Sequence, residues 1–245
     1  MSSTLPLLIV QMGTPPDDLR KLLGEQSTWF AAVLDGHANN LRIVRPYLQE
    51  ALPDESEFSG AIITGSWSMV TTKEDWSVRT GMWAKGLIQS GKPLLGVCYG
   101  HQLMADVMGG VVDYLPAGRE LGTLPVTLND HGRADPFLHF LPTTFYAHLT
   151  HEQAVLAPPP GAENLASSAQ DSYQILRYGP RAISVQFHPE FDVDILRACI
   201  TKRAEALAAE GRDLVELTSS IAETPFATRI LVEFAKAVCE SAIDQ

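Results

Sequence analysis

The chain has 245 residues, of which 45% are hydrophobic and 19% charged, and its formal net charge is −11. This length suffices for one large α/β domain or two small ones with a sizeable buried core. The acidic surface repels phosphate backbones, which argues against a nucleic-acid partner. No apolar run approaches the roughly 18 residues of a membrane span, so no membrane partner is expected either.

The three cysteines, Cys98, Cys199 and Cys239, are too few and too widely spaced to suggest a disulfide framework or a structural zinc site. Cys199 and Cys239 fall inside helical patterns, where we expect small buried hydrophobic residues. The segment Met1–Met12 lacks the basic stretch of a signal peptide and is expected to contain the first strand. Together these features point to the reducing cytoplasm.

In the first half of the chain, short apolar runs alternate with helical patterns. Strands are expected at Leu7–Met12, Leu41–Val44, Ala61–Thr64 and Pro93–Val97, and helices at Glu74–Ser90 and Gln102–Met108. Gly91 follows the first of these helices as a C-cap signal. Strands that alternate with helices predict an α/β fold with a mostly parallel central sheet, flanked by helices on both faces.

From residue 111 to residue 185 the pattern changes to short strands separated by turns rich in proline and glycine. Strands are expected at Val126–Leu128, Thr144–His148, Gln174–Tyr178 and Ala182–Gln186, and amphipathic helices at Ile195–Ala209 and Phe226–Val238. The simplest account is a single domain over residues 1–245, with a C-terminal helical extension from about residue 192. The apolar face of the extension could cover the sheet or a partner subunit, which leaves a homo-oligomer open.

The segment Pro93–Gln102 runs from a buried strand through Gly-x-Cys-x-Gly into a helix. This is the layout of a nucleophile elbow, with Cys98 at the position that many hydrolases give to serine. Gly96 and Gly100 lack the Cβ atoms that would clash where strand and helix approach each other. The helix N-terminus favours a thiolate, and the amide of Tyr99 would point towards an oxyanion. Taken alone, the pattern fits a buried structural cysteine equally well.

A second segment, His188-Pro189-Glu190, follows the strand-like run Ala182–Phe187. Pro189 favours an extended backbone at His188, and residues i and i+2 of an extended backbone project to the same side. Glu190 can therefore orient one ring nitrogen of His188 and leave the other for Cys98. Each residue alone has an ordinary structural explanation, but together with the cysteine turn they favour a Cys-His-Glu triad.

The sequences Gly-Val-Cys-Tyr-Gly-His-Gln at 96–102 and Gln-Phe-His-Pro-Glu-Phe at 186–191 resemble the two signatures of class I glutamine amidotransferases. The resemblance covers roughly residues 7–191, and the cysteine turn is most similar to the amidotransferase domain of GMP synthase. It implies a flavodoxin-like sheet and cleavage of the glutamine side-chain amide. Cys98 would be the nucleophile, His188 the general acid and base, and Glu190 the residue that orients His188.

The resemblance also implies the remaining parts of the site. The backbone amides of Tyr99 and of Ser66 or Gly65 would form the oxyanion hole. Gln102 would lie beside the bound glutamine, and Ser68 would contribute to the substrate pocket.

This sequence departs from the family pattern in two places. Ser66, Trp67 and Ser68 stand where the family has more glycine and a proline, so the shape of the pocket is expected to differ. The segment Thr150–Gln153 is a looser match to the family's Ser-His-Gly/Ser-Asp loop. Gly118–Thr123, in contrast, resembles stand-alone amidotransferases of the GMP-synthase type.

The substrate implied is a small molecule, glutamine or another γ-glutamyl compound, and no cofactor or metal is expected. The chain has no phosphate-binding loop, and the residues after 191 are too few for an ATP-using synthetase domain. Released ammonia would therefore escape or pass to a separate synthetase subunit.

Other functions remain open at this stage. The chain could be a γ-glutamyl peptidase that acts on glutathione-like compounds, or an amidotransferase-like binding protein with an idle site. An α/β-hydrolase would need an acid such as Asp171 before a late histidine, and Glu190 fits better. Four other histidines are expected on the surface or in ordinary hydrogen bonds: His131, His139, His148 and His151. His37 is expected in a loop, and His101 could line the pocket but is more readily explained by packing.

Overall fold

The computed structural model describes residues 5–38 and 40–241, so the first four residues of the expected segment Met1–Met12 lie outside it. Five parallel strands form one half of a nine-stranded sheet, in the order β2, β1, β3, β4, β11. Their bounds are Leu41–Val44 (β2), Leu7–Val10 (β1), Gly60–Ile63 (β3), Leu94–Val97 (β4) and Ala182–Val185 (β11).

The other half of the sheet continues antiparallel from β11. It consists of β10 (Ile175–Arg177), β9 (Glu163–Ser167), β6 (Glu120–Leu128) and β7 (Thr144–His151). A separate two-stranded sheet pairs β5 (Val111–Tyr114) with β8 (Gln153–Ala157). The expected α/β fold with its flanking helices is confirmed, and its parallel half is the one that contains the cysteine turn.

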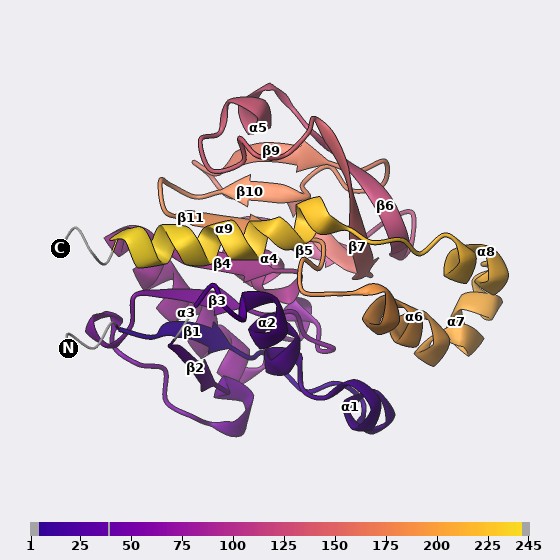
Figure 1. Cartoon of the computed structure of the whole chain (residues 1–245), viewed down its shortest axis with the longest axis horizontal. Helices are drawn as coiled ribbons and strands as arrows, with labels where there is room; N and C mark the ends of the chain where they lie inside the picture. Colours follow the sequence, from indigo (N-terminus) through magenta and orange to yellow (C-terminus); the bar gives the residue numbers. More distant parts are fainter. Residues whose placement is uncertain (1–4, 39, 242–245) are drawn as a thin grey trace.

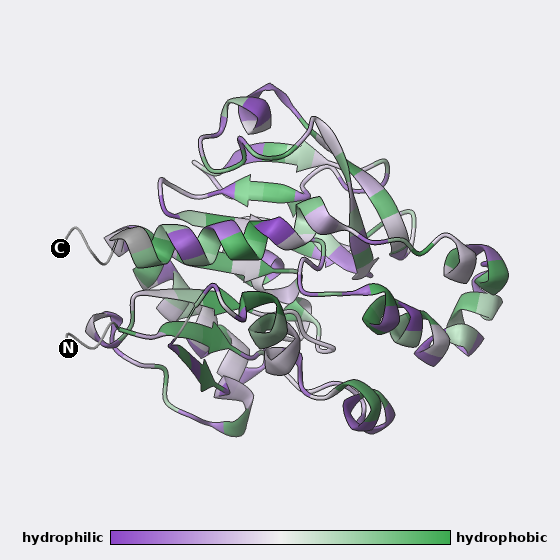
Figure 2. Cartoon of the chain, in the orientation of Figure 1, coloured by the Kyte–Doolittle hydropathy of each residue, from purple (hydrophilic) through white to green (hydrophobic). Residues whose placement is uncertain are grey.

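Successive residues of the central strands face opposite sides of the sheet, so each face has its own apolar core. Leu7 and Ile9 belong to one core, and Leu8 and Val10 to the other. The first core is covered by α2 (Gln26–Leu34) and α9 (Pro225–Ser241), the second by α3 (Asp75–Ser90) and α4 (Tyr99–Val107) (Figure 1). Figure 2 shows hydrophobic residues concentrated along the strands between these layers.

Several elements differ from expectation at their ends. The helix after the cysteine begins at Tyr99 and not at Gln102, because Cys98 alone makes the turn. The strand expected at Val126–Leu128 begins six residues earlier, because the segment Glu120–Thr127 pairs with β7. The sequence did not indicate α1 (Asp17–Leu23), α2, α5 (Asp130–Ala134), β5, β8, β9 or the 3-10 turns at Pro46–Leu48, Glu55–Glu57 and Val70–Thr72.

The C-terminal region contains four helices. The single helix expected over Ile195–Ala209 is wrong, because the backbone leaves helical geometry at Arg203 (φ −99°, ψ 11°). The helices are α6 (Val193–Lys202), α7 (Ala204–Ala209), α8 (Leu214–Ser219) and α9. Within the described part of the chain, none of the helices is both long and apolar enough to cross a bilayer.

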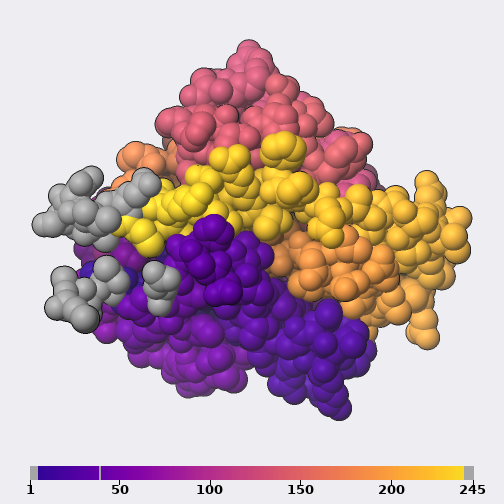
Figure 3. All heavy atoms as spheres, viewed as in Figure 1, coloured from indigo at the N-terminus to yellow at the C-terminus, as the bar shows by residue number. Residues whose placement is uncertain are grey.

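The four C-terminal helices pack in two different ways. The first three protrude beside α1, and α6 packs on a small apolar cluster with Leu19, Trp29 and Phe191. The last helix lies across the sheet between the N-terminal part and the middle of the chain (Figure 3). Cys199 on α6 is buried as expected, but the expectation for Cys239 is wrong, since this residue lies exposed on α9.

Candidate active site

The cysteine turn lies at the carboxyl end of β4, between β3 and β11. Cys98 has φ 50° and ψ −97°, a conformation that L-amino acids rarely adopt, and its amide donates to the carbonyl of Val185 at 2.8 Å. A Cβ atom at Gly96 would lie 2.8 Å from the backbone of Gly100, and one at Gly100 would overlap the carbonyl oxygen of Ile63. The two glycines are therefore required by the close approach of β3, β4 and α4.

Tyr99 is the first residue of α4, so its amide is among those that have no partner within the helix. The side chain is held away from the turn, because its hydroxyl donates to Ser77 at 2.6 Å and its ring stacks on Trp76. Burial raises the pKa of Tyr99 to about 12, so the hydroxyl stays protonated. What Tyr99 presents at the turn is consequently its backbone amide.

His188 and Glu190 follow β11, the strand next to β4. The ring nitrogen Nδ1 of His188 lies 2.8 Å from Oε1 of Glu190, and both side chains are buried. The ring stacks on Phe191 at 4.1 Å between centroids, and the amide of His188 donates to the carbonyl of His148 at 2.8 Å. These contacts fix the orientation of the imidazole.

Parallel pairing brings these two segments together with the turn after β3. Val97 is in register with Val185, so Cys98 and His188 both lie just beyond the carboxyl ends of adjacent strands. A Cβ atom at Gly65 would lie 3.0 Å from Cε1 of His188 and 3.7 Å from Cβ of Cys98. The imidazole and the cysteine therefore converge on the same glycine, and a side chain at this position would press against the imidazole.

The second ring nitrogen of His188 is buried and has no partner of full hydrogen-bond geometry among the described residues, but a side-chain hydrogen bond with Cys98 contributes to raising the pKa of the ring. Burial disfavours the charged ring, but the negative charges of Glu190 and of Cys98 outweigh it and raise the pKa of His188 to about 10. The ring is therefore protonated near neutral pH. It can give a proton to a leaving group, and it stabilises negative charge on the sulfur.

Replacing Glu190 by glutamine is expected to lower the pKa of His188, because the ring stays buried and loses its carboxylate. A folded-state pKa above the ordinary value of 6.5 stabilises the protein below pH 6.5, and this contribution is lost as the pH rises towards 10. The variant should unfold about 1–3 kcal/mol more easily near neutral pH and lose this pH dependence. NMR titration of the ring and urea unfolding across the pH range measure both effects. Exposed Glu205→Gln is the control, and an unchanged titration of His188 would contradict the assignment.

A small cavity opens beside the sulfur of Cys98, with a volume of about 40 Å³. Ser66, Ser68, Tyr99 and Gln102 line it. Ser66 is fixed by its hydroxyl, which donates to the carbonyl of Met12 at 2.8 Å and accepts from the amide of Ser68. Its own amide, and that of Gly65, belong to the turn that faces Cys98.

Gln102 has only its side-chain oxygen available to a ligand in this cavity. Its Nε2 donates to the carbonyl of Gln153 at 2.6 Å and to Oε1 of Gln186 at 3.0 Å. Both amide hydrogens are thus used within the protein. The side-chain oxygen of Gln102 is what remains for a ligand, and it can accept a hydrogen bond from a substrate amide or ammonium group.

The cavity is also lined by residues that the sequence did not assign to the site, among them Trp67, Arg119, Glu152 and Arg203. Arg119 pairs with Glu152 at 2.5 Å and with Glu210 at 3.6 Å. The guanidinium of Arg203 lies over the ring of Trp67, 3.9 Å from its centroid. The Gly118–Thr123 motif could have pointed to Arg119, but no local pattern marks Arg203, which lies inside an ordinary amphipathic sequence.

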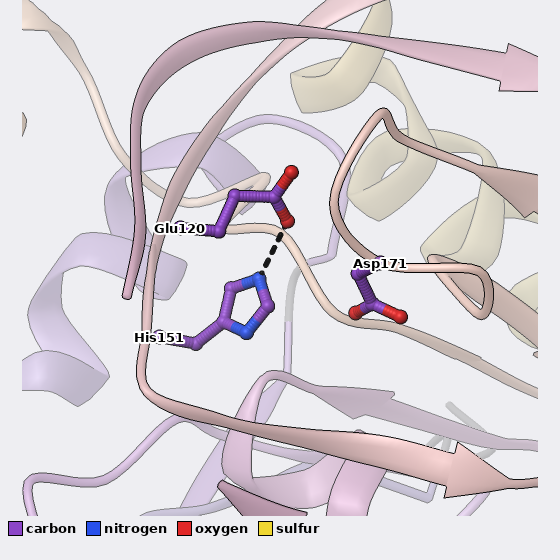
Figure 4. A group of neighbouring side chains, drawn as sticks. All are labelled: Glu120, His151 and Asp171. Carbon is purple, nitrogen blue, oxygen red and sulfur yellow. Dashed lines mark hydrogen bonds and ion pairs between the residues drawn. The ribbon is translucent and has the colours of Figure 1, made fainter. Parts of the chain in front are cut away.

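Next to the cavity, Glu120, His151 and Asp171 form a buried cluster (Figure 4). His151 contacts Oε2 of Glu120 at 2.9 Å through Nε2 and the carbonyl of Gln153 at 3.0 Å through Nδ1. A carbonyl can only accept, so Nδ1 of His151 is the donor to Gln153, and Nε2 faces the carboxylate of Glu120. Both ring nitrogens are thus engaged by the protein, and the cluster works as a structural network.

The other polar residues considered from the sequence also have ordinary partners. Asp171 accepts from the amide of Tyr173 at 2.9 Å. His148 contacts the carbonyl of Ala222, and His139 that of Pro136, while His131 pairs with Glu163 on the surface. His101 is fully buried against Ser184, and burial lowers its pKa to about 3, so this ring is neutral.

A sheet whose parallel half is covered on both faces, with a strained cysteine at the end of a central strand, defines an α/β protein with a candidate cysteine nucleophile. The sequence model of the family described as Glutamine amidotransferase class-I matches residues 39–201. This match covers more than half of the chain. The chain belongs to the class I glutamine amidotransferase family.

Individual relatives agree with this assignment. The glutamine-hydrolyzing GMP synthase of Aeropyrum pernix is 37% identical over 143 residues, which make up 58% of this chain and 26% of that protein. Gamma-glutamyl peptidase 5 of Arabidopsis thaliana is 28% identical over 146 residues, 58% of either chain. The chain thus matches about a quarter of the first relative and somewhat over half of the second.

A solved structure shares the fold along almost the entire chain. The crystal structure of the glutamine amido transferase from Methylobacillus flagellatus superposes with a TM-score of 0.77 at 20% identity. The superposition covers 98% of this chain and 96% of that one.

Proposed function

We propose that this chain hydrolyses the side-chain amide of glutamine or of a closely related γ-glutamyl compound, with Cys98 as nucleophile. The observation that carries the proposal is the convergence of Cys98 and His188 on Gly65, with Glu190 hydrogen-bonded to the far side of the imidazole. A nucleophile, a base and a residue that orients the base are the parts that covalent amide hydrolysis needs. Membership of the amidotransferase family supports the same reaction.

In the first half of the reaction, the Cys98 thiolate attacks the γ-carbonyl carbon and forms a C–S bond. The amides of Tyr99 and of Ser66 or Gly65 would hold the resulting oxyanion, and one such donor is worth about 3 kcal/mol. Protonated His188 gives its proton to the departing nitrogen as the C–N bond breaks. Ammonia, or an amine, leaves and a γ-glutamyl thioester remains.

In the second half, neutral His188 takes a proton from water, and the hydroxide adds to the thioester carbonyl. The C–S bond breaks, glutamate is released, and the thiolate and the imidazolium are restored. Glu190 keeps Nδ1 protonated throughout, so that Nε2 is the nitrogen that accepts and returns the proton. No redox partner or cofactor is consumed in this cycle.

The deciding experiment is a product assay. Purified protein is incubated with glutamine, glutathione and simple γ-glutamyl amides, and both glutamate and the released amine are quantified. Release of glutamate with ammonia from glutamine supports an amidotransferase activity, whose ammonia would go to a separate synthetase subunit. Release of glutamate from peptides only favours a γ-glutamyl peptidase, which the similarity to the Arabidopsis enzyme makes a specific second candidate.

A site that only binds its ligand would behave differently. An electrophilic glutamine analogue should label Cys98, and peptide mass mapping should find the adduct there. Failure to label Cys98, together with no turnover of any γ-glutamyl compound, would sink the proposal and favour a binding protein.

A further inference from the structure

Arg203 reaches the candidate site from the C-terminal region, outside the segments that resemble the family signatures. The helical pattern breaks at this residue, between α6 and α7, and its side chain lines the cavity that also contains Cys98. Its guanidinium stacks on Trp67 at 3.9 Å. The break in the helix thus places a cation against the rim of the pocket.

Arg203 has no ion-pair partner of its own. Within residues 5–38 and 40–241, no carboxylate lies within 4.0 Å of its guanidinium, which donates to the carbonyl of Cys199 at 3.3 Å and also contacts the thiol of that residue. The carboxylate of Glu152 acts on it only from a greater distance, because it pairs with Arg119. Burial lowers the pKa of Arg203. The neighbouring Arg119, in contrast, already has Glu152 and Glu210. A desolvated guanidinium without a counter-ion is a ready binding group for a carboxylate.

The cavity as it stands is too small for an amino-acid substrate. Its volume of about 40 Å³ leaves room for little more than one water molecule, whereas ligand pockets usually measure hundreds of Å³. Arg203 and Trp67 form part of its wall. A substrate that enters beside Cys98 therefore meets the guanidinium of Arg203 at the rim of the cavity.

We infer that Arg203 binds a carboxylate of the γ-glutamyl substrate and so determines which γ-glutamyl compounds the site accepts. This inference rests on the proposed function. Every γ-glutamyl group carries an α-carboxylate at the end opposite the scissile amide. A peptide substrate carries a second carboxylate on its leaving group. Either source would supply the missing counter-ion of Arg203.

The inference is tested by steady-state kinetics of Arg203→Ala and Arg203→Lys. Loss of a charge-assisted hydrogen bond made equally to substrate and transition state should raise KM about 10- to 100-fold and leave kcat nearly unchanged. Lysine keeps the charge but not the planar fork of the guanidinium, so the KM of Arg203→Lys should lie between that of the wild-type protein and that of Arg203→Ala. Arg197→Ala is the matched control, since Arg197 lies exposed on α6 and pairs with Asp194.

Three substrates distinguish the two sources of the carboxylate: glutamine, γ-glutamylmethylamide and γ-glutamylglycine. A rise in KM for all three assigns Arg203 to the α-carboxylate, and a rise for γ-glutamylglycine alone assigns it to the leaving group. An unchanged KM for all three in Arg203→Ala would overturn the inference. A lower KM would also overturn it, and would show that Arg203 merely blocks the pocket.

A second measurement does not depend on turnover. Iodoacetate carries a carboxylate and iodoacetamide does not, so the ratio of their alkylation rates at Cys98 reports attraction by Arg203. This ratio should fall about 10-fold in Arg203→Ala, with a Cys239→Ser background to remove the exposed thiol. The wild-type protein could show no hydrolysis of any substrate while the ratio still falls in Arg203→Ala. In that case the proposed function fails and the carboxylate site stands. If the ratio is unchanged in Arg203→Ala, and this variant unfolds at the same temperature as the wild-type protein, the carboxylate site is refuted.

Discussion

Cys98→Ala should reduce hydrolysis of the best γ-glutamyl substrate by at least about 1,000-fold, because the thioester can no longer form. The variant should fold, since alanine fits wherever the cysteine backbone fits. Steady-state release of glutamate measures the loss, and thermal unfolding checks the fold. Cys239→Ser is the matched control, because that thiol is exposed on α9 and should leave activity unchanged.

Substitutions of Cys98 are also expected to change the free energy of unfolding. Cys98 holds φ 50° and ψ −97°, where a side chain costs about 1–2 kcal/mol and glycine costs little. Cys98→Gly should therefore be more stable than Cys98→Ala by about this amount, while both are inactive. Urea unfolding measures the difference. Near-normal activity in either variant would refute Cys98 as the nucleophile, and equal stability of the two would refute the strain.

Gly100→Ala should have the largest effect on stability, a loss of about 3 kcal/mol or more in the free energy of unfolding. The new Cβ atom would overlap the carbonyl oxygen of Ile63, and β3 would have to move away from α4. The amide of Gly100 donates to the carbonyl of Thr64 at 3.2 Å, so the turn that contains Gly65 would move as well. Activity should fall together with stability.

Gly86→Ala is the matched control for that substitution. Gly86 lies on the exposed side of α3, where a Cβ atom would meet nothing within 4 Å. Alanine is the better helix former, so this variant should gain about 0.5–1 kcal/mol. If Gly100→Ala were as stable as wild type in the same urea series, the tight packing of the cysteine turn would be disproved.

Local sequence was sufficient to predict those parts of the candidate site in which the interacting residues are neighbours along the chain. The glycines around Cys98 indicated a strand–turn–helix, because only a tight turn needs two residues without side chains so close together. The spacing of His188 and Glu190 indicated a hydrogen bond between them, because an extended backbone puts both on one side. The alternation of strands and helices was enough for the fold class.

Tertiary structure determined everything that joins distant segments. The parallel register of β3, β4 and β11 brings Gly65, Cys98 and His188 to one point, and register is set by packing across the whole sheet. The break at Arg203 also appears only in the folded chain, since its sequence continues a regular helical pattern. A residue 105 positions beyond Cys98 enters the pocket because α6 packs on Phe191 and its neighbours, a long-range contact that no local pattern encodes.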